Sequence, residues 1–328
     1  MKKILNELIE HKSLSKASAK QVLVNIAEGK HNTSEIAAFL TTFMMRSIKV
    51  EELEGFREAL LDLCVAVDLE GQETMDLCGT GGDGKNTFNI STLSSFVAAG
   101  AGIKVTKHGN YGVSSSCGSS NVMEYLGYQF TNNPDVLKKE LNDCGITFLH
   151  APLFHPAMKN VAPIRKELGM KTFFNMLGPL VNPANPTMQL TGVYSLELMR
   201  LYNYLLQKTK KNYLIVYALD GYDEISLTSD FKINTKTEER IYSPEQLGFS
   251  MQKQQDIYGG DTVPEAAKIF TTILAGKGTL EQNNAVIANS AMAIYLAQNT
   301  SMENAVGIAK ESLESGKANA IFKNLLNR

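Results

Sequence analysis

Hydrophobic positions in the first 70 residues recur at intervals of three and four, the spacing that places side chains on one face of a helix. Such stripes cover Leu5, Leu8 and Ile9, and then residues 14–28, 33–45 and 50–67. Gly29 suits the end of a helix, and Thr33 suits the start of the next one. Because no stretch here alternates as a half-buried strand does, the pattern predicts a small all-helical domain over residues 1–70.

From Met75 onward, short apolar runs alternate with helical stretches, a pattern that is typical of a mostly parallel sheet. The predicted strands are residues 75–77, 103–106, 146–149, 189–194 and 213–219. The predicted helices between them are residues 91–100, 119–126, 134–143, 156–168 and 195–208. A polar, mixed stretch at 225–260 indicates hairpin-like strands and loops, and residues 264–328 read as helices. The predicted fold class is α/β: a small all-α N-terminal domain plus a large α/β domain with a mostly parallel central sheet and C-terminal helices.

The region richest in glycine and small polar residues, 76–121, lies between these short strands. Gly79, Gly81, Gly82 and Gly84 follow the first strand, and Asn89-Ile90-Ser91-Thr92 opens a helix. The second strand leads into Lys107-His108-Gly109-Asn110. Glycines let backbone N–H groups face a ligand, and a helix N-terminus favours negative charge. One glycine pair could be an ordinary turn, but two such stretches at successive strand ends predict a phosphate site.

The segment from Gly79 to Lys85 comes close to the nucleotide P-loop motif but does not complete it. Asn86 stands where the motif requires a magnesium-binding Ser or Thr, and Thr87 comes one residue late. A P-loop nucleotide hydrolase is therefore a disfavoured alternative.

Composition argues against several classes of protein. A net charge of −2 gives no general attraction to nucleic acid or to an anionic membrane. We expect neither a secretory signal nor a membrane span, because no apolar run is long enough. The four cysteines form no C-x-x-C pair, which predicts reduced thiols in a cytoplasmic protein. They are Cys64, Cys78, Cys117 and Cys144.

Several of these stretches together resemble the anthranilate phosphoribosyltransferase family. The three signature-like stretches are Gly79-Thr80-Gly81-Gly82-Asp83, Asn89-Ile90-Ser91-Thr92 and Lys107-His108-Gly109-Asn110. The likeness continues through His155-Pro156-Ala157-Met158, Val161-Ala162-Pro163-Ile164-Arg165, Asn175-Met176-Leu177-Gly178-Pro179 and Asp223-Glu224. The resemblance covers essentially the whole chain, and the separation of its motifs makes it specific.

The resemblance implies transfer of the phosphoribosyl group of phosphoribosyl pyrophosphate (PRPP) to anthranilate, in tryptophan biosynthesis. It also implies Mg²⁺, two ions in our expectation, and a homodimer formed through the helical domain. Residues 163–186 are broken by prolines and glycines into short helices and turns. By resemblance we assign about 166–186 to the helical domain as an insertion, which leaves 71–165 and 187–328 for the large PRPP-binding domain.

We expect the PRPP contacts to come from the three signature stretches and the serine-rich loop that follows them. Backbone N–H groups of the glycine loop would hold the pyrophosphate, Lys107 would add a point charge, and the helix start would add further donors. The predicted PRPP-binding residues are Gly79, Gly82, Asp83, Thr87, Asn89, Ile90, Ser91, Thr92, Lys107, His108, Gly109, Asn110, Ser114, Ser115 and Ser119.

Asp223 and Glu224 follow an apolar strand at its carboxyl end, where adjacent carboxylates can share Mg²⁺ with phosphate oxygens. An acidic pair in a loop is otherwise usually solvated charge. By resemblance, Ser91 completes one metal shell. The predicted metal ligands are therefore Ser91, Asp223 and Glu224.

For anthranilate, the spacing of His155, Met158, Ala162 and Arg165 predicts one face of a continuous helix over 156–168. The Arg165 guanidinium suits a carboxylate, although it could equally be a solvated side chain. The predicted anthranilate-binding residues are Gly79, Asn110, His155, Met158, Arg165 and Gly178. No residue is assigned as a general base, because a neutral arylamine already offers its lone pair.

The chain departs from the family pattern beside the third signature. Many relatives have Arg-Ser after the Lys-His-Gly-Asn motif, where Tyr111-Gly112 stand here. Many also have Gly-Ser-Ala-Asp in place of Gly118-Ser119-Ser120-Asn121, and a lysine in place of Ser116. These differences remove positive charge near the phosphates. The alternatives that stay open are a pyrimidine nucleoside phosphorylase of the same fold and a non-catalytic relative that binds nucleic acid.

Overall fold

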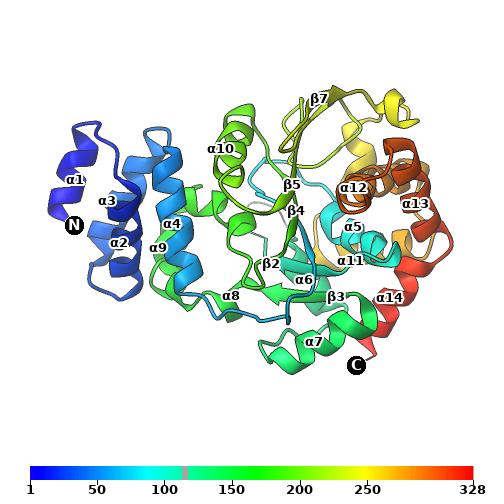
Figure 1. Cartoon of the computed structure of the whole chain (residues 1–328), viewed down its shortest axis with the longest axis horizontal. Helices are drawn as coiled ribbons and strands as arrows, with labels where there is room; N and C mark the ends of the chain where they lie inside the picture. Colours follow the sequence, from blue (N-terminus) through cyan, green and yellow to red (C-terminus); the bar gives the residue numbers. More distant parts are fainter. Residues whose placement is uncertain (113–116, 328) are drawn as a thin grey trace. The chain divides into compact units, whose positions relative to one another are not determined.

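The computed structural model describes residues 1–112 and 117–327, and these residues form two compact units. The first unit contains Met1–Val67 and Ala151–Asn185, and the second contains Asp68–His150 and Pro186–Arg328. Figure 1 shows the elements in sequence colours.

The first unit is entirely helical, as its hydrophobic periodicity predicts. Its N-terminal helices are α1 (Lys2–Ile9), α2 (Lys16–Ala27), α3 (Thr33–Met44) and α4 (Val50–Asp62). Its second segment contributes α8 (Ala151–Phe154), the 3₁₀ helix η1 (Pro156–Asn160), α9 (Ala162–Leu168) and the 3₁₀ helices η2 (Phe173–Met176) and η3 (Gly178–Leu180). Asn32 begins α3 with a capping box, in which its side chain and that of Glu35 exchange hydrogen bonds with backbone N–H groups.

An aromatic cluster joins the two segments of the helical unit. Phe173 stacks on Phe56 with ring centroids 4.4 Å apart, and it meets Phe39 and Phe43 edge-on. Aromatic pairs of this kind contribute about 0.5–1.5 kcal/mol beyond the burial of their area. The returning segment begins at Ala151, so the assignment of 151–165 to the large domain was wrong. The prolines and glycines of the sequence suggested that the segment begins near residue 166, whereas side-chain packing places its start at Ala151.

A seven-stranded sheet forms the centre of the second unit, with strand order β3-β2-β1-β4-β5-β6-β7. The first five strands in the chain pair in parallel, and β5, β6 and β7 pair antiparallel. Their bounds are β1 (Met75–Gly79), β2 (Val105–Gly109), β3 (Ile146–His150), β4 (Met188–Gly192), β5 (Asn212–Ala218), β6 (Phe231–Asn234) and β7 (Glu239–Tyr242). The β6–β7 pair is the hairpin that the mixed composition of 225–260 indicated.

Helices of the second unit cover this sheet and bury its apolar strands. They are α5 (Ile90–Gly100), α6 (Ser119–Tyr125), α7 (Pro134–Cys144), α10 (Leu196–Leu206), α11 (Val263–Leu274), α12 (Leu280–Gln298), α13 (Met302–Glu314) and α14 (Lys317–Leu326), with the 3₁₀ helices η4 (Pro244–Leu247) and η5 (Gln254–Ile257). Figure 1 shows α5 among α12, α13 and α14, all of which it contacts. The core is therefore built around α5, whose first turn belongs to the predicted phosphate site.

The second strand corrects one sequence prediction. It runs over Val105–Gly109, so Lys107 and His108 lie within β2 and not in the loop after it. Both side chains are buried. The polar side chains of Lys107 and His108 suggested a loop, but these residues pair with Phe148 and Leu149 of β3, which keeps them in the sheet.

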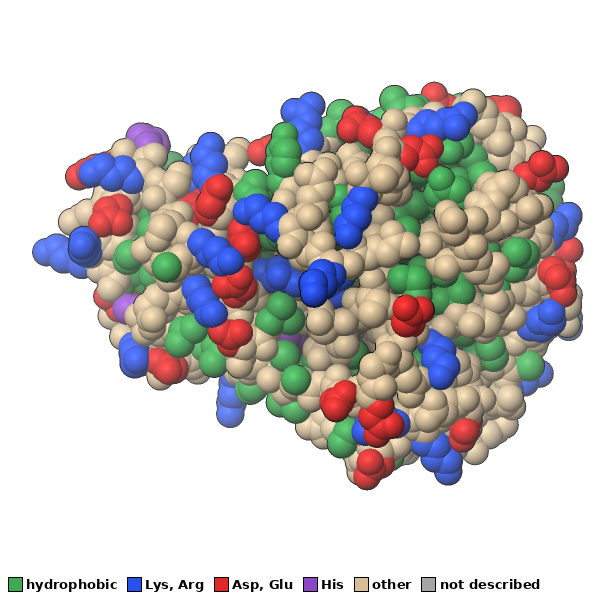
Figure 2. Space-filling view, viewed as in Figure 1, with side chains coloured by type: hydrophobic (Ala, Val, Ile, Leu, Met, Phe, Trp, Pro, Cys, Tyr) green, Lys and Arg blue, Asp and Glu red, His purple; other side chains and the backbone are tan. Residues whose placement is uncertain are grey.

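Basic and acidic side chains are interspersed over the second unit on the face shown in Figure 2. This distribution agrees with the small net charge of −2. Among the residues that the structure describes, every helix is too short or too polar to cross a lipid bilayer.

Candidate active site

Two glycines at neighbouring strand ends allow an acidic side chain to sit directly against the sheet. A Cβ atom on Gly79, the last residue of β1, would lie 2.2 Å from Oδ2 of Asp223. A Cβ atom on Gly192, the last residue of β4, would lie 1.5 Å from the backbone oxygen of Asp223. Any other residue at either position would displace Asp223, so these glycines place the carboxylate at the carboxyl ends of the parallel strands.

The glycine loop after β1 adopts the backbone conformation that its composition predicts. Gly81, Gly82 and Gly84 have positive φ angles of 63°, 80° and 75°, which other residues rarely adopt. The backbone N–H of Gly81 donates to Oδ2 of Asp223 at 2.7 Å. The Asp83 carboxylate accepts the backbone N–H of Lys85 at 3.0 Å, so Asp83 braces the loop as expected.

The same loop argues against a P-loop. The residues after Lys85 do not open a helix directly, because α5 begins only at Ile90. The side chain of Asn86 donates to the backbone oxygen of Gly260 at 2.9 Å, and Thr87 forms a β-bridge with Tyr258. The segment that would hold a nucleotide phosphate in a P-loop is here tied to the C-terminal half of the unit.

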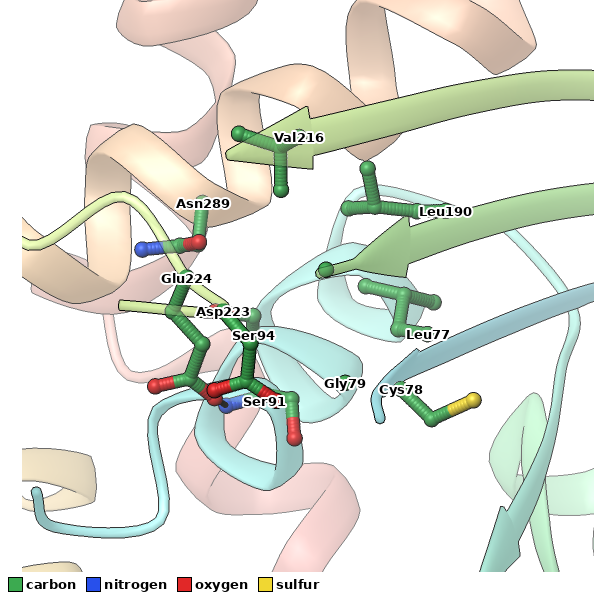
Figure 3. Close-up of a pocket in the computed structure, with 11 residues that line it drawn as sticks. Leu77, Cys78, Gly79, Ser91, Ser94, Leu190, Val216, Asp223, Glu224 and Asn289 are labelled. Atoms are coloured by element: carbon green, nitrogen blue, oxygen red, sulfur yellow. Dashed lines mark hydrogen bonds between the residues drawn. The ribbon is translucent and has the colours of Figure 1, made fainter. Parts of the chain in front are cut away.

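Asp223 and Glu224 line a small cavity beyond the ends of β1, β4 and β5 (Figure 3). Its volume is ≈ 20 Å³, which holds about one water molecule. Ser91 faces the same space, and the apolar side chains of Leu77, Leu190 and Val216 form its other wall. Two carboxylates and a hydroxyl therefore line one side of the cavity, and apolar side chains line the other.

Burial and mutual repulsion hold both carboxylates close to protonation. Burial, followed by the negative charge of Asp83, raises the pKa of Asp223 to about 7. Burial and the neighbouring charge of Asp223 raise the pKa of Glu224 well above its ordinary value. Two such acids side by side are stabilised when a cation joins them. This electrostatic environment is that of a cation site.

Glu224 is oriented by the helix start that sequence reasoning assigned to phosphate. Its Oε1 accepts the backbone N–H of Ser91 at 3.0 Å, in the first turn of α5. Its Oε2 is buried and has no hydrogen-bond partner among the described residues. The helix N-terminus favours the carboxylate at Oε1, and Oε2 keeps a lone pair for a ligand.

Lys107 lies beneath the acidic pair as a fully buried side chain. Its ammonium donates to the backbone oxygen of Leu77 and to Oγ of Ser91, the latter at 3.4 Å. Burial lowers the pKa of Lys107, and the negative charges around it, among them Glu224, oppose that shift. The charge therefore acts on the site through Ser91 and Glu224.

The remaining predicted PRPP residues fall on α5 and on the end of β2. Ile90 and Thr92 are buried in the first turn of α5, and the side chain of Asn89 donates to the backbone oxygen of Cys117 at 3.1 Å. The backbone N–H of His108 donates to Oδ1 of Asp76 at 3.1 Å. Gly109 ends β2, and a Cβ atom there would lie 2.5 Å from Oγ of Ser119. Ser114 and Ser115 lie outside the described residues.

The predicted anthranilate face on one continuous helix is wrong. Residues 156–168 form a 3₁₀ helix, η1, and then a separate α-helix, α9, so the spacing from His155 to Arg165 does not define one face. Pro163 lies at the start of α9, because its ring and missing N–H exclude it from a helix interior. His155 precedes η1, Met158 lies within it, and Gly178 begins η3.

Arg165 itself has the environment of an anion-binding residue. Nη2 donates to Oδ1 of Asn175 at 3.2 Å, and the guanidinium lies over the ring of Phe174, 5.4 Å from its centroid. No carboxylate among the described residues pairs with it, and burial lowers the pKa of Arg165. Arg165 is partly buried, whereas its neighbour Lys166 is exposed.

The donor set fits a magnesium ion that shares its shell with a substrate. No group of three or more His, Cys, Asp or Glu side chains that could hold a metal occurs among the described residues. Asp223 and Glu224, with the buried Oε2, offer a few oxygen ligands and leave positions for phosphate and water. Mg²⁺ is commonly bound in this way, by one or two carboxylates together with substrate phosphates.

The sequence did not indicate two residues, distant in the chain from the motifs, that hold the acidic pair in place. The side-chain amide of Asn289 on α12 accepts the backbone N–H of Ile225 at 2.9 Å and donates to the backbone oxygen of the same residue at 2.8 Å. It thereby fixes the chain just after Glu224. The signal that was available is an asparagine within the apolar run of a helix. Gly192 carried no comparable signal.

Models of two domain families match the chain. The model described as "Glycosyl transferase family, helical bundle domain" matches residues 2–64, and "Glycosyl transferase family, a/b domain" matches residues 71–319. Curated proteins named anthranilate phosphoribosyltransferase resemble the chain over its whole length. The protein from Flavobacterium psychrophilum is 61% identical over 99% of this chain and 98% of its own. The protein from Cytophaga hutchinsonii is 54% identical over 98% and 99%.

Solved structures agree with these matches. Anthranilate phosphoribosyltransferase from Thermus thermophilus superposes with a TM-score of 0.91 at 30% identity, over 98% of each chain. The Saccharomyces cerevisiae enzyme, in complex with PRPP and Mg, superposes with a TM-score of 0.91 at 28% identity, over 98% of this chain and 96% of its own. The fold, the strand-end site and these relatives together place the chain in the anthranilate phosphoribosyltransferase family, within the glycosyl transferases.

Proposed function

We propose that this protein transfers the phosphoribosyl group of PRPP to anthranilate at the strand-end site, giving N-(5-phosphoribosyl)anthranilate and pyrophosphate, a reaction of tryptophan biosynthesis. The observation that carries the site assignment is the buried acidic pair beside the glycine loop, with Oε2 of Glu224 left without a hydrogen bond. A pair of this kind needs a cation, and a glycine loop next to it supplies backbone donors for a polyanion.

PRPP is held by the glycine loop, the first turn of α5 and the end of β2. The N–H groups of Gly79, Gly82 and Asp83 face the pyrophosphate, because the positive φ angles along the loop turn successive amides to one side. Asn89, Ser91 and Thr92 add donors at the start of α5. The wider set includes Thr87, Ile90, Lys107, His108, Gly109, Asn110 and Ser119, together with Ser114 and Ser115 of the undescribed segment.

Asp223, Glu224 and Ser91 are the protein ligands for Mg²⁺, and two ions are bound. When bound, the metal neutralises charge on the departing pyrophosphate. The chain's own residues keep the ligands in place: Gly81 donates to Asp223, Ser91 donates to Glu224, and Lys107 offsets part of their negative charge. The yeast relative in complex with PRPP and Mg supports the choice of Mg²⁺ as the metal.

Anthranilate is bound through its carboxylate by Arg165, a half-buried guanidinium without an acidic partner among the described residues. A planar guanidinium matches a carboxylate with two parallel hydrogen bonds. By the family resemblance, the further residues assigned to anthranilate are Asn110, His155, Met158, Gly79 and Gly178. The yeast relative in complex with 4-fluoroanthranilate supports the choice of ligand class.

Bond making needs no general base in this proposal. The amine of anthranilate is neutral near pH 7, and its lone pair attacks C1 of the ribose as the bond to pyrophosphate breaks. The two electrons of that bond leave with the pyrophosphate, and the amine loses a proton to solvent after attack. Catalysis rests on placing the two substrates and on stabilising the leaving charge.

The same proposal includes a homodimer through the helical unit and a cytoplasmic location. Ile9 and Met45 of that unit are 66% and 83% exposed, and exposed apolar side chains of this size suit a subunit contact. The four cysteines are free, which agrees with a reducing compartment.

The test of the proposed reaction is the fluorescence of anthranilate on mixing with PRPP and Mg²⁺, repeated with EDTA. Loss of the signal only when PRPP and metal are both present supports the transfer. No loss from a protein that is shown to be folded contradicts it. Inorganic phosphate with a pyrimidine nucleoside is the control that would reveal a nucleoside phosphorylase.

A further inference from the structure

Four described residues at which this chain departs from the family motif, Tyr111, Gly112, Ser120 and Asn121, lie close to Asn110. The backbone oxygen of Asn110 accepts from the N–H of Ser120 at 3.2 Å and from Oγ of Ser119 at 3.4 Å. Its side-chain Oδ1 accepts the backbone N–H of Tyr111 at 2.8 Å. The acceptors of Asn110 are therefore occupied, and its exposed side-chain Nδ2 keeps its donors for a ligand.

Tyr111 is anchored on two sides. Its hydroxyl donates to the carboxylate of Glu124 on α6, 3.2 Å from Oε1 and 3.3 Å from Oε2. Its ring meets the ring of His150 edge-on, with centroids 4.7 Å apart. Because both contacts fix the position of Tyr111, they also fix the peptide plane that joins it to Asn110. That plane carries the N–H which orients the Asn110 side chain.

The partner ring is itself held rigidly. Nδ1 of His150 lies 2.9 Å from Oγ of Ser120, and its ring stacks on Phe130 with centroids 4.6 Å apart. Only 6% of His150 is exposed. Ser120 thus contacts both His150, through its hydroxyl, and Asn110, through its N–H. Tyr111 therefore packs against His150, which is linked through Ser120 to Asn110, the residue that Tyr111 orients.

Asn121 closes the other side of this turn. Its Oδ1 accepts the backbone N–H of Gly112 at 2.9 Å and that of Gly118 at 3.0 Å. A Cβ atom on Gly118 would lie 2.2 Å from the nitrogen of Gly112, so the two backbone segments touch. Asn110, Tyr111 and Gly112 therefore have little freedom to shift against α6.

We propose that Tyr111 is a positioning residue for anthranilate binding: its ring and hydroxyl, held by His150 and Glu124, fix Asn110 with its amide donors directed to the substrate. The inference rests on the proposed role of Asn110. Tyr111 does not touch the reacting atoms and acts through Asn110, so its loss should raise the KM for anthranilate. A smaller rise in the KM for PRPP should accompany it, because Asn110 is also assigned to PRPP.

The first experiment compares steady-state kinetics of Tyr111→Ala with those of Tyr125→Ala, a change of the exposed tyrosine that follows Glu124 on α6. Tyr111→Ala should raise the KM for anthranilate about tenfold, the cost of about one well-placed hydrogen bond. Tyr125→Ala should match the wild-type protein. Equal values for Tyr111→Ala and the wild type would overturn the inference.

A second pair of variants keeps the test valid if Tyr111→Ala does not fold. Glu124→Ala removes the anchor of the hydroxyl, and Glu124→Gln retains an acceptor for it. Glu124→Ala should raise the KM for anthranilate about threefold, because the Tyr111 hydroxyl loses its hydrogen bond to a carboxylate. Glu124→Gln should return the KM to the wild-type value. The absence of both the rise and the rescue contradicts a positioning role.

A double-mutant cycle separates this inference from the assignment of Asn110. In the Asn110→Ala background, Tyr111→Ala should change the KM for anthranilate by less than about twofold, because the group on which it acts is gone. Independent, multiplying effects would overturn the inference alone. If Asn110→Ala has the wild-type KM for anthranilate, the assignment of Asn110 and the inference both fail, while the fluorescence assay still decides whether transfer occurs.

Discussion

Two glutamates, Glu52 in the helical unit and Glu224 in the α/β unit, differ in how far their carboxylates are hydrogen-bonded. In the helical unit, Glu52 has no exposed surface, and each of its carboxylate oxygens accepts two hydrogen bonds. The donors are the guanidinium of Arg46 and the backbone N–H groups of Leu14 and Lys49. In the α/β unit, Glu224 accepts one N–H at Oε1, none at Oε2, and lies beside another carboxylate.

This difference separates a carboxylate that supports the fold from one that we propose binds a cation. A buried carboxylate with all its acceptors filled joins elements of the helical unit, here α4, the end of α3 and the start of α2. A buried acidic pair without enough donors costs folding free energy and is retained where a bound cation compensates for it. Protein stability should therefore depend on Glu52, and activity on Asp223 and Glu224.

The largest expected effect is on catalysis. The double variant Asp223→Asn, Glu224→Gln should lower kcat/KM by about a thousandfold, about 4 kcal/mol of transition-state stabilisation, because the metal site loses its charge. Its thermal unfolding midpoint should rise, because the folded wild-type protein must either take up protons on this pair or bury its negative charge, and the neutral amides do neither. Kinetics and calorimetry measure both quantities, and the exposed Glu303→Gln serves as the control. A fall in the midpoint would contradict the comparison.

The second effect is on stability alone. Glu52→Ala should lower the free energy of unfolding of the helical unit by about 3 kcal/mol, because it leaves the Arg46 guanidinium buried without its partner. Urea denaturation measures the change. Glu10→Ala, which removes the exposed partner of Lys12, should leave the free energy of unfolding unchanged. If Glu52→Ala were as stable as the wild type, the four hydrogen bonds would not stabilise the unit.

The third effect is the stabilisation of the folded protein by bound Mg²⁺ and PRPP. Mg²⁺ with PRPP at about a hundred times the dissociation constant should stabilise the protein by about 2.7 kcal/mol, as for any ligand that binds only the folded state. The unfolding midpoint, measured with and without EDTA, reports this shift. The double variant at Asp223 and Glu224 should show little of it, and Glu52→Gln should show all of it. Equal shifts in the two variants would place the metal elsewhere.

The smallest effect concerns Arg165, a cation that lacks an acidic partner among the described residues. Arg165→Ala should raise the KM for anthranilate about thirtyfold, about 2 kcal/mol for a lost hydrogen bond to a charged group. Arg165→Lys should not restore it, because an ammonium cannot form the paired hydrogen bonds of a guanidinium. The exposed neighbour gives the control, Lys166→Ala. An unchanged KM in Arg165→Ala would remove Arg165 from the pocket.

The glycine loop and the acidic pair were predictable from sequence because their signals are local. Gly81, Gly82 and Gly84 adopt positive φ angles, a requirement that the residue type itself expresses. Asp223 and Glu224 follow an apolar strand, and the carboxyl ends of parallel strands share one edge of a sheet. The helical unit followed in the same way from its hydrophobic stripes.

The amino-acid sequence by itself determined the elements, their order, the family and the edge of the sheet at which the polar motifs meet. Only the tertiary structure decided that Lys107 is buried inside β2, that 151–165 packs with the helical unit, and that η1 and α9 are separate helices. It also decided which charges are satisfied. Burial and hydrogen bonding depend on residues that are distant in the chain, as Glu224 depends on Ser91, and no local pattern records such partners.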